Sequence, residues 1–223
     1  NAGRGGGIFN QGLTHLYRSS VNNNSGLAGQ GGGAYNDFGG LLFLQNTMVS
    51  ANMVDPPSLP GGSGIFNLND MRLEFVTMAY NNTDGIRNDA GGHFTIRSSV
   101  LAYHALGNCT GSPGMPSSGH NIEDDDTCGL VESSDLINTD PQLAFLASNG
   151  GNGLSQMPNP GSPAIDSGDQ DKCIAEDQRS IARPQGVRCD RGSVEVEVAA
   201  VPPATATPLP LGTITGALCY PSE

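Results

Sequence analysis

The stretch Gly5-Gly-Gly-Ile-Phe-Asn10 decides the fold, because close versions of it return three times along the chain. They read Gly-Gly-Gly-Ala-Tyr-Asn at 31–36, Gly-Ser-Gly-Ile-Phe-Asn at 62–67 and Thr-Asp-Gly-Ile-Arg-Asn at 83–88. The last glycines of the four copies lie 26, 31 and 21 residues apart, and a β-prone run follows each copy. A unit of this length cannot enclose a core of its own, whereas stacked units bury one continuous apolar column. The repeat therefore predicts an all-β fold of the β-solenoid type.

Equivalent residues of stacked units are expected to lie directly above one another, about 4.8 Å apart. Glycine at a tight corner supplies a positive φ or lets two backbones approach closely, and asparagine there can form a ladder of side-chain amides instead of an ordinary turn. The predicted core column is Ile8, Ala34, Ile65 and Ile86. The predicted repeat corners are Gly7, Gly33, Gly64 and Gly85 with the ladder Asn10, Asn36, Asn67 and Asn88.

The residue between the aliphatic position and the asparagine forms a second expected column. Its members are Phe9, Tyr35, Phe66 and Arg87. We interpret them as corner packing, and a strip that stacks sugars or docks a partner is the alternative. In the later units Leu73 and Phe75 flank Glu74, and Phe94 and Ile96 flank Thr95. This alternation predicts one buried and one solvated face.

Composition supports strand and turn over long charged helices. The chain of 223 residues has 32 glycines, 15 prolines, no tryptophan and only 14% charged residues. The net charge of −12 would repel nucleic-acid phosphates, so no nucleic-acid partner is expected. Residues 1–7 lack a basic start followed by an apolar run, and we predict neither a signal peptide nor a membrane span in this chain.

The five cysteines fit no zinc pattern, because no Cys-x-x-Cys pair or Cys/His cluster occurs. Two pairs close loops of moderate length, and we predict the disulfides Cys109–Cys128 and Cys173–Cys189. Disulfides persist mainly outside the cytosol, which favours an extracellular or cell-surface location over a cytosolic protein with reduced thiols. Cys219 is left over, either as a free thiol or for a bond to another chain.

Several motifs resemble bacterial surface proteins of the choice-of-anchor Q type. The resemblance is carried by the openings at 5–10 and 31–36, the insertion from Asn108 to Cys128, the run from Gly161 to Asp169, and the segment from Asp177 to Asp190. It covers about residues 5 to 197. It implies a right-handed parallel β-helix that is secreted and tethered at the cell surface, akin to the repeats of polymorphic outer-membrane proteins, with no agreed chemistry. Arg191 departs from the pattern, which usually has an uncharged residue there.

Three regions are expected along the chain. Residues 1–104 form regular coils, 105–198 form an irregular, cystine-stapled cap that closes the apolar column at its C-terminal end, and 199–223 form an Ala/Pro/Thr linker with a short β-prone tail. The chain begins inside a repeat, so the first coil is expected to expose strand edges. Edges and tail together predict self-association into a homo-oligomer or filament.

Candidate chemistry is weak by comparison. Asn82-Thr83-Asp84-Gly85 resembles one motif of β-helical polygalacturonases, but the second aspartate pair and the basic partners of that family are missing, and we interpret it as a repeat corner. Asp124–Asp126 could bind Ca²⁺, as could the turn that holds Asp166, Asp169 and Asp171. A solvated loop and turn-capping aspartates are the preferred interpretations, so we predict no catalytic residue, no metal site and no cofactor.

The sequence thus predicts a non-catalytic, secreted structural protein that self-associates or acts as an adhesin, with surface polysaccharide as a further partner. A polysaccharide-active lyase or glycoside hydrolase is the first alternative, and a passive carbohydrate-binding module is the second.

Overall fold

The computed structural model describes residues 4–27, 30–55, 61–89, 91–111 and 116–197. Apart from one 3₁₀ helix, η1 (Gln170–Lys172), all regular elements in these ranges are strands, so the all-β prediction is confirmed. The strands are β1 (Ile8–Asn10), β2 (Leu13–Tyr17), β3 (Ser20–Asn22), β4 (Ser25–Leu27), β5 (Ala34–Asn36), β6 (Leu41–Ser50), β7 (Met53–Asp55), β8 (Ile65–Asn67), β9 (Asp70–Ala79), β10 (Asp84–Asn88), β11 (His93–Arg97), β12 (Val100–Ala102), β13 (Gly107–Gly111) and β14 (Ile122–Glu123).

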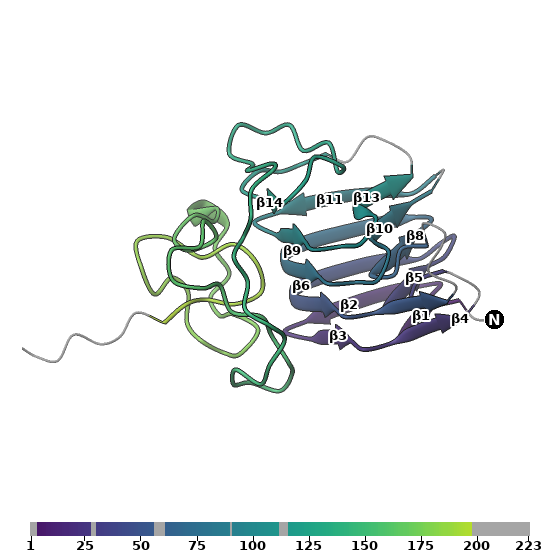
Figure 1. Ribbon diagram of the computed structural model, residues 1–223, viewed down its shortest axis with the longest axis horizontal. Coiled ribbons are helices and arrows are strands. Elements are labelled where there is room, and N and C mark those ends of the chain that lie inside the picture. The colour runs from purple at the N-terminus through teal and green to yellow at the C-terminus, as the bar shows by residue number, and fades with distance from the viewer. Residues whose placement is uncertain (1–3, 28–29, 56–60, 90, 112–115, 198–223) are drawn as a thin grey trace, which may run out of the picture.

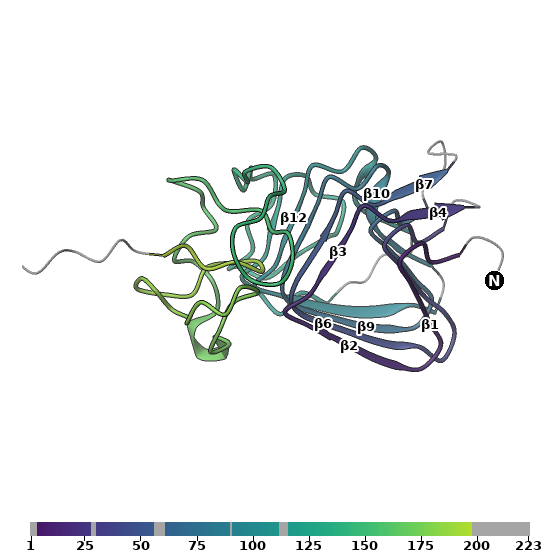
Figure 2. The same cartoon turned by 90° about the horizontal axis from the view of Figure 1, so that it is seen from below.

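The named strands pair only in parallel and form three sheets (Figure 1). One sheet has the order β1-β5-β8-β10-β13. The second has the order β14-β12-β9-β6-β2, with β11 beside β9 and β3 beside β6. The third pairs β4 with β7. Viewed from below, successive strands of each sheet lie over one another around a three-sided outline (Figure 2).

The register of the first sheet aligns the predicted core column. Ile8 pairs with Ala34, Ala34 with Ile65, and Ile65 with Ile86. Ala34, Ile65 and Ile86 are buried, and the partly buried Ile8 packs against the same core cluster. The four repeats therefore share one apolar interior, which is the central expectation from the sequence.

The corner glycines act through close approach and not through a left-handed backbone. A Cβ on Gly33 would lie 2.6 Å from the carbonyl oxygen of Gly64, so no side chain fits between these repeats. The positive φ of the same corner falls two residues earlier, at Gly31, where φ is 63°. Of the two explanations for the glycines, the close approach of backbones applies at the repeat glycine itself.

Two columns of buried asparagine line the interior. In the predicted ladder each amide nitrogen donates to the next amide oxygen, from Asn10 to Asn36, Asn67 and Asn88, at 2.7 to 2.8 Å. A second ladder, which the glycine–asparagine spacing did not predict, runs from the partly buried Asn24 to the buried Asn52 and Asn81 at 2.9 and 3.0 Å. Each ladder satisfies the buried amides where one sheet gives way to the next.

The alternation expected around Glu74 fails at Phe75. The long strand β9 bends there because Phe75 has a φ of 51°, and the equivalent residues Arg18, Asn46 and Ser98 are also left-handed. This corner turns Phe75 away from the interior, and the guanidinium of Arg183 lies 4.8 Å above its ring. Phe75 is therefore buried beneath the C-terminal segment, outside the core cluster that contains its neighbours.

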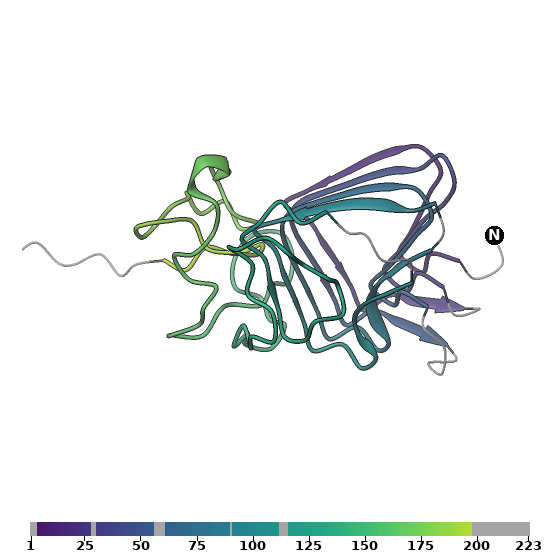
Figure 3. The same cartoon turned by 90° about the horizontal axis from the view of Figure 1, so that it is seen from above.

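The region after residue 104 covers more than the end of the stack. Strands β13 and β14 extend two sheets past the expected boundary, and Cys109, Cys128 and Leu130 join the core cluster. The following chain then runs down the side of the stack (Figures 1 and 3). It bonds to successive repeats there, because Glu176 pairs with Arg18 and accepts a hydrogen bond from Asn46 through its carbonyl oxygen.

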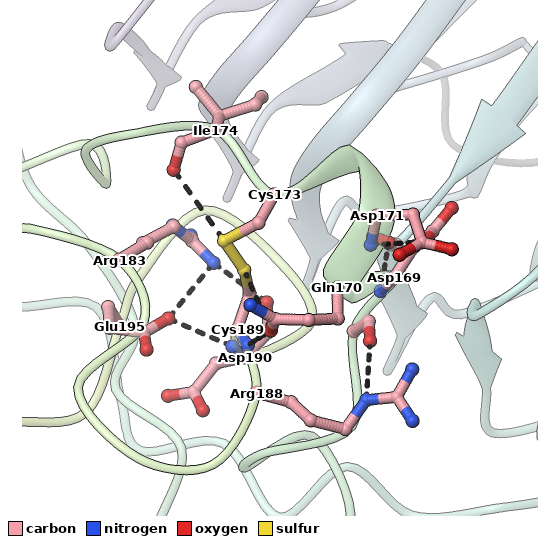
Figure 4. Close-up of a disulfide and its surroundings, with 12 residues drawn as sticks. Asp169, Gln170, Asp171, Cys173, Ile174, Arg183, Arg188, Cys189, Asp190 and Glu195 are labelled. Atoms are coloured by element: carbon pink, nitrogen blue, oxygen red, sulfur yellow. Dashed lines mark hydrogen bonds and ion pairs between the residues drawn. A yellow bond between two sulfur atoms is a disulfide. The ribbon is translucent and has the colours of Figure 1, made fainter.

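Two disulfides and a buried ionic network hold this segment. Cys109 is joined to Cys128, and Cys173 to Cys189, as the sequence predicts. Beside Cys189 the fully buried Arg183 donates to Glu195 at 3.2 Å (Figure 4). Further donors fix the segment to the sheets: the Ser193 amide donates to the Thr77 hydroxyl, and Arg191 donates to the Asn121 carbonyl. Arg191 is thus a contact between the C-terminal segment and the stacked strands.

No helix in the described ranges is long and apolar enough to cross a membrane. The linker and β-prone tail expected at 199–223, including Cys219, lie outside the described residues.

Candidate binding site

The aromatic column that the sequence suggested is a packing feature. Phe9, Tyr35 and Phe66 stack with ring centroids 5.5 and 5.0 Å apart, but Tyr35 and Phe66 are buried. Arg4 lies 5.4 Å over the Tyr35 ring and covers it. This column offers no free ring face to a sugar at Tyr35 or Phe66, which agrees with the preferred interpretation.

The polygalacturonase-like aspartate is a structural acceptor. The Asp84 carboxylate is buried and accepts hydrogen bonds from the Gly61 and Gly62 amides and from the Thr83 and Thr110 hydroxyls. These donors occupy the carboxylate and fix the corner between β8 and β10. Asp84 is therefore unavailable to a substrate, as its interpretation as a repeat corner requires.

The acidic runs also bind the chain's own donors. The Asp124 and Asp125 carboxylates both accept from the Asn108 side chain, and Asp124 also accepts from the Tyr103 amide. In the second run Asp166 accepts from the Arg188 amide, and Asp169 caps the 3₁₀ helix through the Asp171 amide. Over the described ranges, no three or more His, Cys, Asp or Glu side chains are grouped so that they could hold a metal ion.

The histidines are dispersed, and His104 is enclosed. Burial lowers the pKa of His104 to about 4, and its Nδ1 accepts from the Asn81 amide at 3.1 Å, at the end of the second asparagine ladder. The neutral ring continues the ladder where an asparagine would otherwise lie. His104 is partly buried, its Nε2 is buried and its Nδ1 is bonded, so it is a structural group.

The best candidate site is the outer face of the sheet formed by β2, the first half of β6, the first half of β9 and β11, which we call the outer face. Because side chains alternate along a strand, every second residue of these strands points away from the core. Register then arranges the outward residues in three rows across the strands. The rows are Leu13, Leu41, Asp70 and His93; His15, Phe43, Arg72 and Thr95; and Tyr17, Gln45, Glu74 and Arg97.

Aromatic rings cover one side of the outer face. The His15 and Phe43 rings stack with centroids 4.4 Å apart, and the Arg72 guanidinium lies 5.5 Å over Phe43. Tyr17 lies beside His15 at 6.2 Å and is exposed. Phe43 is partly buried and lies between His15 and Arg72, so the exposed His15 and Tyr17 rings are the ones that can stack against the apolar face of a ring-shaped ligand.

A carboxylate between two arginines forms the polar side of the outer face. Arg72 Nε and Arg97 Nη2 each donate to the same Glu74 oxygen at 2.7 Å, and Gln45 donates to the other oxygen at 3.0 Å. The Glu74 side chain is only 6% exposed for this reason, although its alternation predicted a solvated residue. Two guanidinium groups against one carboxylate leave a local surplus of positive charge and of N–H donors.

Two clefts open beside this ion-pair cluster. One, of about 250 Å³, is lined by the cluster together with Thr95 and Ser118. Its neighbour, of about 320 Å³, is lined by Leu41, Asp70, His93 and Pro116. Both clefts lie between the sheet and the 116–118 segment, which bridges to β11 through Ile96 and Ser117. The Nε of Arg97 is buried here without a hydrogen-bond partner among the described residues.

This site could hardly be predicted from the sequence. Its outward residues come from four strands whose spacing differs from repeat to repeat, so their shared rows are defined only by the strand register. The available signal was the alternation in β2, β6, β9 and β11, which places an aromatic, basic or polar residue at every second position.

The fold and the outer face define an all-β protein of stacked parallel strands, one of whose sheets carries aromatic and cationic side chains on its outer face. Comparison with protein-family models finds no match, and neither curated protein sequences nor solved structures match the chain.

Proposed function

We propose that this is a non-catalytic, extracellular adhesive protein that binds a polysaccharide on the outer face of a right-handed parallel β-helix. The β-helix is supported by three parallel sheets whose strands follow one another in repeat order and align the same core column. An extracellular location is supported by the two disulfides. The resemblance to choice-of-anchor Q surface proteins fits both features.

The observation that carries the proposal is the row His15, Phe43, Arg72 and Thr95 beside the clefts. Sugar rings have an apolar face that stacks on aromatic rings, and their hydroxyl and carboxylate oxygens accept hydrogen bonds. The exposed His15 and Tyr17 rings suit the first property. The Thr95 and Ser118 hydroxyls that line the cleft suit the second. A chain of sugars can lie across several strands and use both sides of the face.

Binding without catalysis is favoured by the state of the acidic residues. Hydrolysis of a glycosidic bond needs a carboxylic acid and a carboxylate on opposite sides of the bond. Each of the two clefts includes one carboxylate, from Glu74 or Asp70, and Glu74 has both oxygens bonded to neighbouring side chains. Glu74 therefore orients the arginines and is not free to transfer a proton.

The test is binding to a panel of neutral and carboxylated polysaccharides, by retardation in affinity gels or by calorimetry. Tyr17→Ala and Arg72→Gln should each weaken binding about tenfold, which is about 1.4 kcal/mol. The control is Val187→Ala, because Val187 is 82% exposed and lies outside the outer face. Equal binding by all variants would place the site elsewhere, and new reducing ends or unsaturated products would show an enzyme instead.

Self-association through coil ends and through residues 199–223 stays a prediction.

A further inference from the structure

A second exposed aromatic cluster lies at a different corner of the stack, where β9 and β12 end. We call it the aromatic corner and define it by Tyr80, Tyr103 and Phe145. The Tyr80 ring lies 4.8 Å from Tyr103 and 6.3 Å from Phe145, and both pairs are tilted. Phe145 is 83% exposed and Tyr80 is also exposed. Tyr80 and Tyr103 occupy equivalent left-handed positions in successive repeats, so the backbone directs both side chains outward at the same corner.

A cleft of about 380 Å³ opens beside the Tyr80 and Phe145 rings. Ala51, Leu154 and Asn23 form other parts of its wall. A cleft of this volume can hold a small chemical group. It is too small to be a protein-binding surface, because a stable protein interface covers about 800 Å² on each partner. Because the two ring centroids are 6.3 Å apart, a compact group in the mouth can lie within about 6 Å of both.

The surroundings of the aromatic corner are acidic. The Tyr103 hydroxyl donates to Asp140, and the Tyr103 amide donates to Asp124. After burial, the charges of Asp140 and Asp124 are the next causes of the raised pKa of Tyr80, so both carboxylates act on the ring that lines the cleft. The whole chain adds to this field with a net charge of −12.

Two arginines in segments near the cleft are already paired: Arg18, which lines a neighbouring cleft together with Leu154, and Arg179, which donates to the Asn149 carbonyl. Arg18 pairs with Glu176 at 2.5 Å, and Arg179 pairs with Asp177 at 3.0 Å. Their charges are largely compensated, so the negative potential at the aromatic corner persists. Ring faces carry negative charge in their quadrupole, and carboxylates behind the rings strengthen the attraction for a cation.

We propose that the aromatic corner binds a quaternary or methylated ammonium group, held against the Tyr80 and Phe145 rings in the cleft. Such a cation is weakly hydrated and apolar in shape, so it satisfies both the aromatic wall and the acidic surroundings. The inference does not depend on the outer face, because the two sites share no residue.

The experiment compares choline with its neutral isostere 3,3-dimethylbutan-1-ol, titrated into the whole chain and followed by NMR of the Tyr and Phe ring protons. Choline should saturate and bind at least about fivefold more tightly than the isostere, as expected for a cation–π contribution. Phe145→Ala should abolish saturation, and Asp140→Asn should weaken binding about threefold. Because Phe145 is 83% exposed, its replacement leaves the fold intact, and Val187→Ala, 82% exposed, is the matched control.

Equal affinity for the two ligands would overturn the proposal, since the site would then recognise shape alone. Absence of saturable choline binding, or unchanged choline binding in Phe145→Ala, would overturn it as well. Tighter choline binding that is lost in Phe145→Ala and kept in Val187→Ala supports it.

Discussion

Replacing Asn67, an interior member of the predicted ladder, by alanine should destabilise the protein more than replacing Asn10 at the end of the ladder. The Asn67 amide is buried and donates to Asn88 at 2.8 Å and to the Asn69 carbonyl at 2.7 Å, and it accepts from Asn36 at 2.7 Å. Without it the Asn88 side-chain oxygen loses the donor that the ladder provides. The lost bonds to the Asn69 carbonyl and from Asn36 cost about 1 kcal/mol each, and the unpaired Asn88 oxygen costs about 1–3 kcal/mol. The expected loss in the free energy of unfolding is therefore about 3–5 kcal/mol.

The end of the ladder supplies the comparison. Asn10 is buried and donates to Asn36, whose buried side-chain oxygen would lose this donor. The Asn10 oxygen accepts from the exposed Gly12 amide and the partly exposed Thr14 hydroxyl, and both of these groups can bond water in its place. Asn10→Ala should therefore cost only about 1–3 kcal/mol, for the unpaired acceptor alone. Asn152 is exposed, and Asn152→Ala should change stability by less than about 0.5 kcal/mol.

The assay is urea unfolding of the oxidised protein followed by far-UV circular dichroism, with linear extrapolation to water. The slope with urea should stay constant across the three variants, so that midpoints report stability directly. If Asn67→Ala lost no more stability than Asn10→Ala, the buried amide ladder would not be a cooperative source of stability, and the reasoning would be refuted.

Three further predictions concern the region after β12. Glu123 is buried, and burial raises its pKa to about 8, so the folded protein keeps this carboxyl protonated where the unfolded chain loses the proton. The resulting contribution to the free energy of unfolding is fully present below about pH 4.5 and is lost as the pH rises through 8. Urea midpoints should fall between pH 5 and 9, and Glu123→Gln should flatten this slope; parallel slopes would contradict it. Replacing both Cys109 and Cys128 by alanine removes a link of sequence separation 19 and should cost about 3 kcal/mol in thermal unfolding, whereas an unchanged midpoint would show that the link is dispensable. Arg183→Met leaves the buried Glu195 carboxylate without its cation and should cost about 3–5 kcal/mol, with faster proteolysis of the C-terminal segment; unaltered proteolysis would argue against this anchor.

The repeat interior was predictable because a single spacing rule defined it. Every repeat glycine is followed three residues later by asparagine, so the first ladder and the core column could be read from the sequence. The second ladder had a weaker signal, since Asn24, Asn52 and Asn81 follow the first-ladder asparagines by 14, 16 and 14 residues. Neighbouring asparagines obscure it, and only the left-handed residue before each member shows which amide points inward.

The contacts on the outer face could not be predicted from alternation alone, because alternation does not say which strands lie side by side. Alternation correctly directed Glu74 away from the core, but its burial results from Arg72 on the same strand and Arg97 on the next one. The partner on β11 is set by strand register across a repeat of a different length. Phe75 was misplaced for a related reason, because a left-handed residue inside a strand interrupts the period of two.

The C-terminal segment lies along the side of the stacked repeats, and this restricts how the number of repeats can change in evolution. Ordinary tandem arrays gain or lose units freely, because each unit touches only its neighbours. Here Glu176 and Ser193 of the C-terminal segment contact Arg18, Asn46 and Thr77, which lie in three successive repeats. Deleting one repeat would remove one of these contacts and shift the others, so the number of repeats and the length of the segment must evolve together.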